Sequence, residues 1–386
     1  MAALAAAVTI GSIRIQAQAP AAGIVIDSLD LQKKRNEIVA AKGKKVFYAN
    51  KRFDLDKLPH YVPERQVFGL IRMWGLNYIW DSPLAKYWEE GFRKFQPGVA
   101  FEYHMPTALT STSALVTGVA DIGANRKMTF TEILQFERMF SYDPFEIPMA
   151  TGSLDVTGYS DAMCIFVNQD NPISQLTLKQ LDGIFGAARE GGFVRNTWHP
   201  EFARGPEENI RTWGQLGLTG EWQAKSIHPH GAVIKYDTAT KFADAVLHSS
   251  DMWNENTRMH CNTQLADGTW ASWAAQIADG VAADRYAIGY TGHFYNSPKL
   301  KVVAIQFKDG GPYVEPTLES VQSREYELFQ ANYWYLNRPP GQPIDSKVKE
   351  YLRYVLSREG QEQVVRDGKY LPLNATLVRE ALQSLN

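Results

Sequence analysis

Two hydrophobic periods alternate along most of this chain. From residue 69 onward, short apolar runs with a period of two positions are followed by segments whose apolar residues recur every three or four positions. The first pattern is typical of half-buried strands and the second of amphipathic helices. The pattern predicts strands at residues 69–75, 99–103, 120–123, 146–150, 163–168, 286–290 and 301–306. It predicts helices that begin near residues 82, 111, 129, 177 and 237, and one or two helices over residues 346–366.

The alternation of strands with helices predicts an α/β fold. A middle region rich in Gly and Trp lies between two apolar strands, which favours a second lobe inserted into the first through two crossings. We expect each lobe to be a mixed, mainly parallel sheet flanked by helices, and the lobes to be joined by a two-strand hinge. Residues 69–152 and 289–386 form lobe 1 in this interpretation, and residues 153–288 form lobe 2.

The N-terminal part differs from the rest. Residues 25–68 carry the runs KKRNE and KGKK and are interpreted as a peripheral extension, mostly a solvated face. Residues 1–24 include an Ala-rich apolar run and the sequence AQA at positions 17–19, which is similar to a signal-peptidase site. A basic region before that run is missing, so a disordered Ala-rich tail is the alternative. We favour export, and thus a periplasmic or secreted protein.

The composition of the chain excludes some classes of partner and of chemistry. The chain has 386 residues, with 40 Lys and Arg against 42 Asp and Glu, so no global field attracts nucleic acid or an anionic membrane. Cys164 and Cys261 form no CxxC pair, and a disulfide between them is possible but has no support from their spacing. No Walker loop, GxGxxG, GxSxG or HExxH motif is present, and His228-Pro229-His230 is interpreted as a turn. We therefore predict no catalytic residues, no metal and no cofactor.

One polar segment, residues 106–129, has the features of an anion site. Thr110, Ser111 and Thr112 open a short helix, where free N–H groups and hydroxyls attract negative charge, although ordinary capping is the simpler explanation for any one of them. Asp121 could accept a hydrogen bond from phosphate, which keeps a proton at neutral pH, and repel sulphate. Arg126 could bind an oxyanion with two hydrogen bonds, pair with Asp121, or simply be exposed.

A second polar helix start lies in the middle region. Lys235, Asp237, Thr238 and Thr240 stand at the beginning of a predicted helix that carries apolar residues further along. A capped amphipathic helix is the plain explanation. Two helix N-termini aimed at one cleft from two lobes would clamp an anion with preorganised N–H groups.

Several longer phrases are similar to one known family. SALVTGVADIGANRKMTFTE, FEIPMA, NPISQLTLKQLDGIF and RTWGQLGLTGEW resemble the extracytoplasmic phosphate-binding proteins of ABC transporters, which have the type II periplasmic-binding-protein fold. The resemblance covers residues 66–386. It implies a monomeric two-lobed clamp that closes on inorganic phosphate, or a related oxyanion, and delivers it to an ABC permease in the inner membrane.

The resemblance also implies ligand contacts. They fall on the loop that holds Asn77, on the hydroxyls at 110–112, on Asp121 and on the segment 235–240. The last segment departs from the family pattern, because Lys235 stands for Arg and Thr-Ala-Thr for Ser-Gly-Thr. A sensor or interaction module on the same fold, with a different small anion, is the alternative function. An enzyme is disfavoured because no nucleophile–base set is visible.

Overall fold

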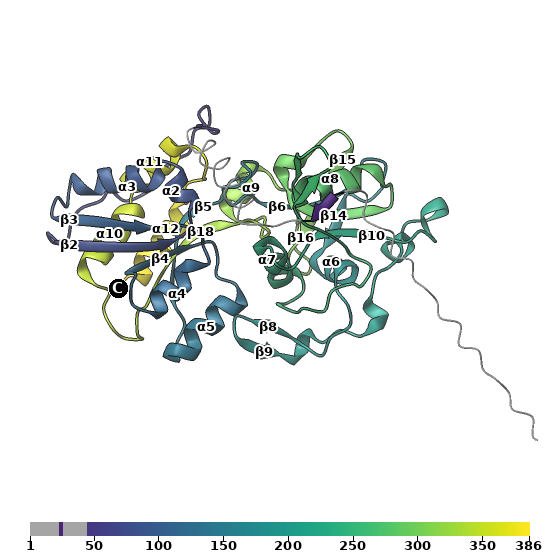
Figure 1. Cartoon of the computed structure of the whole chain (residues 1–386), viewed down its shortest axis with the longest axis horizontal. Coiled ribbons are helices and arrows are strands. Elements are labelled where there is room, and N and C mark those ends of the chain that lie inside the picture. The colour runs from purple at the N-terminus through teal and green to yellow at the C-terminus, as the bar shows by residue number, and fades with distance from the viewer. Residues whose placement is uncertain (1–22, 26–44) are drawn as a thin grey trace, which may run out of the picture.

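The computed structural model describes residues 23–25 and 45–386 and contains two lobes (Figure 1). The first lobe is built on a five-stranded sheet with the order β3-β2-β4-β18-β5. Its strands are β2 (Gly69–Gly75), β3 (Val99–His104), β4 (Ile122–Asn125), β5 (Phe145–Thr151) and β18 (Ala331–Leu336). Its helices are α2 (Tyr78–Asp81), α3 (Leu84–Arg93), α4 (Thr110–Val116), α5 (Phe130–Phe140), α10 (Ser346–Val355), α11 (Arg358–Asp367) and α12 (Ala375–Ser384).

The second lobe has its own five-stranded sheet, with the order β11-β10-β14-β6-β15. The strands are β6 (Met163–Asn168), β10 (His228–Ala232), β11 (Arg258–His260), β14 (Ala287–Gly292) and β15 (Leu300–Val302). Three smaller sheets are formed by β7 (Gln175–Thr177) with β16 (Ala304–Gln306) and β17 (Tyr313–Val314), by β8 (Gly192–Val194) with β9 (Thr197–His199), and by β12 (Thr263–Leu265) with β13 (Trp270–Ala271) and β1 (Gly23–Val25).

The α-helices of the second lobe are α6 (Leu178–Phe185), α7 (Asp237–Val246) and α8 (Trp273–Ala283), and α9 (Leu318–Ser323) precedes the return to the first sheet. Short 3-10 helices occupy η1 (Pro200–Phe202), η2 (Pro206–Glu208), η3 (Trp213–Leu216), η4 (Gly220–Trp222) and η5 (His293–Tyr295). None of the helices within residues 45–386 combines the length and apolar character needed to cross a bilayer.

Both large sheets are mixed, as the sequence predicts, but parallel pairs do not predominate. In the first sheet β2 pairs in parallel with β3 and β4, whereas β18 is antiparallel to β4 and β5. The second sheet repeats this arrangement, with β10 parallel to β11 and β14, and β6 antiparallel to β14 and β15. The antiparallel strands are the two that follow the crossings between the lobes. Strand β6 enters the second sheet from the first lobe, and β18 enters the first sheet from the second lobe.

The two crossings lie side by side. The Gly152 N–H donates to the carbonyl of Gln330 at 2.8 Å, and the Met163 N–H donates to that of Leu328 at 3.0 Å. Strands β14 and β15 still belong to the second sheet, so this sheet continues past residue 288, where lobe 2 was expected to end. The chain returns to the first sheet only at β18, after β14 and β15 have paired with the two edges of β6 and satisfied its backbone hydrogen bonds.

Residues 45–68 are mostly exposed, as the sequence predicts, but the segment is anchored to the first lobe. Five apolar side chains of this segment are buried in the hydrophobic core: Tyr48, Leu55, Leu58, Tyr61 and Val67. The Tyr61 hydroxyl donates to Glu350 at 2.7 Å, and its ring meets Tyr354 edge-on. Widely spaced apolar residues anchor an otherwise charged segment to α10 and α3. Residues 1–22 of the predicted signal-like segment 1–24, the run KKRNE and all but the last residue of KGKK lie outside the described residues.

Local sequence rules place most element ends. The capping boxes at Thr129 and Thr177 are present at the starts of α5 and α6. The predicted helical stretch over 346–366 divides into two helices at Ser357, which caps α11. The predicted strand 301–306 divides between two sheets as β15 and β16.

Cys164 and Cys261 are both free thiols, so the disulfide that the sequence left open does not form.

A buried histidine pair in the second lobe should make stability depend on pH. His230 Nδ1 lies 3.0 Å from His260 Nε2, and both side chains are buried. Burial, followed by the charge of His260, lowers the pKa of His230 to about 4, with Arg258 and His228 acting in the same direction and Asp284 against it. Between the ordinary pKa and this value the unfolded chain binds the extra proton, so the free energy of unfolding falls as pH falls, by about 3 kcal/mol across the window.

Urea unfolding at pH 7, 6 and 5 measures this slope. We expect His230→Gln, whatever its stability at pH 7, to reduce the dependence without abolishing it, since burial also lowers the pKa of His260. An unchanged slope in the variant would contradict the assignment to His230.

Candidate functional site

A cleft of about 560 Å³ lies between the two lobes. Tyr78 and Arg126 line it from the first lobe, and Asp237 and Thr238 from the second. Arg126 directly follows β4, and Tyr78 lies just after β2, so both stand at the carboxyl ends of neighbouring parallel strands. Ligands of open α/β sheets bind at this edge.

Charged side chains from both lobes meet at the cleft. Arg126 Nη1 forms an ion pair with Asp237 Oδ2, and Lys241 Nζ lies 3.7 Å from the same oxygen. Burial first, and then the positive charge of Arg126, lower the pKa of Lys241 well below its ordinary value. Two basic side chains thus share one carboxylate, and an anion bound beside them would favour the charged form of Lys241.

The beginning of α7 faces this cleft. The N-cap residue is Tyr236, whose side chain makes no capping hydrogen bond, and Asp237 and Thr238 occupy the first turn and line the cleft. The N-cap therefore lies one residue before Asp237 and two residues before Thr238. A helix start without a side-chain cap leaves backbone N–H groups for an anion.

The start of α4, which the sequence predicts to bind the anion from the first lobe, has its polar groups already bonded. The N–H groups of Thr110 and Ser111 already donate to the carbonyls of Thr107 and Ala108, at 3.1 Å each. The Thr110 hydroxyl also donates to Thr107, and the Ser111 hydroxyl accepts from Asn125 Nδ2 at 2.9 Å. The N–H groups of Thr110 and Ser111 are therefore not available to a ligand, because they bond to the turn that leads into α4.

The other residues predicted to bind the ligand do not line the cleft. The Thr112 hydroxyl is buried and has no hydrogen-bond partner among the described residues. Asn77 donates to Asp81 at 2.8 Å, next to Tyr78. Lys235 Nζ lies 5.7 Å from the centre of the Tyr236 ring. Thr240, on the same helix as Asp237, lines a second cavity on the other side of α7.

Asp121 is not in the cleft. It precedes β4, at the end of the strand opposite Arg126, and accepts from Arg72 through the backbone N–H at 2.8 Å and through Nη2 at 2.9 Å. Burial acts to raise the pKa of Asp121, but the hydrogen bonds from Arg72 bring it below its ordinary value. The interpretation of Asp121 as a ligand acceptor is therefore corrected, and Arg126 pairs with Asp237 instead.

A second contact joins the lobes outside the cleft. The β8–β9 hairpin of the second lobe reaches α5 of the first (Figure 1). The rings of Phe193 and Phe130 lie 4.7 Å apart, and Arg195 pairs with Asp143 at 2.7 Å. The lobes are thus in contact both at this hairpin and at the Arg126–Asp237 pair, while the cleft beside that pair persists.

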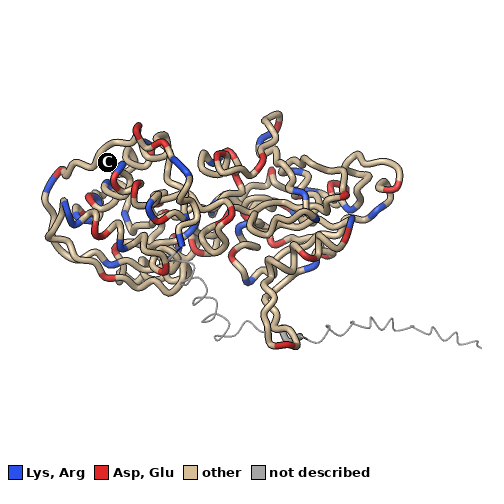
Figure 2. The backbone as a smooth tube through the Cα atoms, turned by 90° about the horizontal axis from the view of Figure 1, so that it is seen from above, with Lys and Arg blue, Asp and Glu red and all other residues tan. Residues whose placement is uncertain are grey.

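Charge is otherwise spread evenly. Acidic and basic residues are interspersed over both lobes (Figure 2). With 40 basic and 42 acidic residues in the chain, recognition of an anion depends on the few groups that line the cleft.

Comparisons with known proteins agree with this architecture. Residues 80–359 match the PBP superfamily domain. The phosphate-binding protein PstS of Pseudomonas aeruginosa is 31% identical over 329 residues, which cover 85% of this chain and 90% of that protein. Protein SphX of Synechococcus elongatus is 24% identical over 227 residues, 58% of this chain and 57% of SphX.

A solved structure shows the same fold. PstS from Borrelia burgdorferi superposes with a TM-score of 0.51 at 16% sequence identity, and the match covers 79% of this chain and 99% of that one. The fold, the match over residues 80–359 and the identity to PstS of P. aeruginosa together establish that the chain belongs to the PBP superfamily and, within it, to the PstS family of substrate-binding proteins.

Proposed function

We propose that this protein is an extracytoplasmic solute-binding protein that captures phosphate, or a similar tetrahedral oxyanion, between its lobes for an ABC importer. The observation that carries the proposal is the convergence of Arg126 and the uncapped start of α7 on one cleft. Membership of the PstS family supports it, as does the relative's name as a phosphate-binding protein. Such a protein binds and releases its ligand and is not an enzyme.

Among the predicted ligand residues, we assign direct contact to Arg126, Asp237 and Thr238. Arg126 offers planar N–H groups to the oxyanion, and Thr238 offers a hydroxyl and a backbone N–H. Asp237 takes the role that the sequence suggested for Asp121, because a carboxylate accepts a bond from protonated phosphate and repels sulphate. Asn77, Ser111 and Thr112 do not line the cleft, and we assign them no direct contact with the ligand.

The partners follow from the same proposal. A monomer in the periplasm would present its two lobes to the permease of an ABC importer. The alternative of a sensor or interaction module relied on the N-terminal extension lying outside the transport core. Five side chains of residues 45–68 pack into the core, so this part of the extension belongs to the first lobe and does not favour the alternative.

Calorimetry with the full chain tests the proposal. We expect phosphate and arsenate to release or absorb heat with one site per chain, sulphate to bind far more weakly, and phosphate to raise the melting temperature. Absence of both heat and thermal shift with phosphate, sulphate, arsenate and molybdate would overturn it.

A further inference from the structure

We infer that the cleft is built for a phosphate monoester, with the phosphate group at Arg126 and an organic group against a wall of aromatic side chains. The inference rests on the proposed function for its anionic end. It adds a second subsite and a class of ligand, and the residues that argue for it lie in the second lobe.

The first argument is size. The cleft measures about 560 Å³ although the lobes already touch through the Arg126–Asp237 pair and through the β8–β9 hairpin. Clefts of about 300–1,000 Å³ hold organic ligands of drug size. An oxyanion of five heavy atoms would fill only a small part of this space, since even one water molecule takes about 30 Å³ of liquid volume.

The second argument is the chemistry of the lining. Trp270 of β13 and Trp273 at the start of α8 line the cleft, together with Tyr295 and Met163. Both tryptophans are half-buried. An isolated oxyanion gains little from indole faces, whereas a carbon skeleton or ring packed on them removes apolar surface from water and can stack.

The third argument is that the aromatic wall and the anionic end form one continuous unit. Tyr236, the N-cap of α7, stacks on Trp273 with ring centres 5.7 Å apart. The Tyr236 hydroxyl accepts from the Asn262 N–H at 2.9 Å, and Asn262 Oδ1 accepts from the Trp273 N–H at 3.1 Å. These contacts hold the wall at a fixed position relative to the helix start that faces Arg126, which suits a ligand with a phosphate at one end and an organic group at the other.

Titration with three probes tests the inference: inorganic phosphate, glycerol phosphate and phenyl phosphate. We expect phenyl phosphate to bind at least about tenfold more tightly than inorganic phosphate, with glycerol phosphate between them. Trp270→Ala should remove most of that difference and leave the affinity for inorganic phosphate unchanged, while Trp270→Phe should keep part of it. Trp198→Ala, at a half-exposed tryptophan of β9 that lines the other cavity, is the matched control.

The outcomes separate the two proposals. If inorganic phosphate binds as tightly as both esters, or Trp270→Ala weakens all three ligands equally, the second subsite is refuted and the phosphate site stands. If none of the three probes binds, the proposed function fails together with this inference.

Discussion

Arg126→Gln lowers the affinity for phosphate by at least about 30-fold, since loss of one partner from a desolvated charged contact costs about 2–5 kcal/mol. Within the described residues Arg126 is the only lysine or arginine that lines the cleft. Its side chain is 14% exposed, so its attraction for an anion is only partly screened by water. Calorimetry at one ionic strength measures the change.

The structure of the variant should survive the substitution. Asp237 keeps Lys241 as a basic neighbour at 3.7 Å, so no carboxylate is left without a counter-charge. Removal of Arg126 also removes a cause of the lowered pKa of Lys241, which then carries its charge more readily. Arg126→Lys should bind with intermediate affinity, because it keeps the charge and loses the planar pair of donors.

Arg93→Gln is the matched control, since Arg93 lies on α3 with a side chain that is 55% exposed. It removes the same charge from the surface of the first lobe and should leave phosphate binding within about twofold, as expected of exposed charges. Equal losses in the two variants would mean that net charge, and not a contact in the cleft, governs binding.

Sequence patterns placed the strands well and the site less well. The predicted strands at 69–75 and 163–168 have the ends observed for β2 and β6, because the first pattern ends at Gly75 and the apolar run of the second ends at Asn168. The predicted strand at 120–123 is observed at Ile122–Asn125, where Met73 of β2 pairs with Ile122. This shift of two residues explains the misplacement of Asp121, since it puts Asp121 before the strand and Arg126 directly after it.

The aromatic wall had no signature in the sequence. Trp270 lies on a two-residue strand, and Trp273 begins a helix whose apolar residues also read as core. Asp161 and Gln330 reach the cleft from the two crossings, which lie 169 residues apart in the chain and meet through a hydrogen bond of 2.9 Å. Such residues come together only because distant strands pair in the folded protein. The spacing of apolar residues along the chain does not predict which strands pair.

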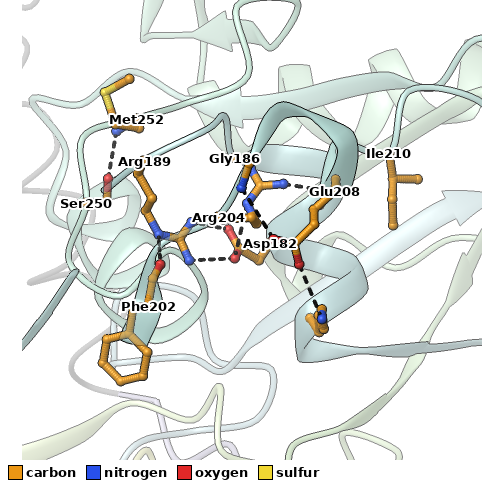
Figure 3. Close-up of polar contacts among 12 residues, drawn as sticks. Asp182, Gly186, Arg189, Phe202, Arg204, Glu208, Ile210, Ser250 and Met252 are labelled. Atoms are coloured by element: carbon orange, nitrogen blue, oxygen red, sulfur yellow. Dashed lines mark hydrogen bonds and ion pairs between the residues drawn. The ribbon is translucent and has the colours of Figure 1, made fainter. Parts of the chain in front are cut away.

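Asp182→Asn is expected to lower the free energy of unfolding by about 3–5 kcal/mol, the cost of breaking a buried ion pair from one side. Asp182 lies on α6 and accepts from Arg189 Nη1 and Nη2, both at 2.6 Å (Figure 3). Arg204 Nε lies 3.5 Å from the same carboxylate. The three side chains are nearly inaccessible, so Asn would leave two buried guanidinium groups without their counter-charge.

Urea unfolding followed by tryptophan fluorescence measures this loss, with Glu190→Gln as the control for an exposed acid beside Arg189. The control should change stability by less than about 0.5 kcal/mol. Because the cluster ties α6 to the loop before η2 and does not line the interlobe cleft, the folded fraction of Asp182→Asn should keep its affinity for phosphate. A stable variant would mean that backbone carbonyls, such as that of Glu208 for Arg204, already satisfy the buried arginines. A lost affinity in the folded state would instead show that this cluster sets the position of α7 and, through it, the geometry of the cleft.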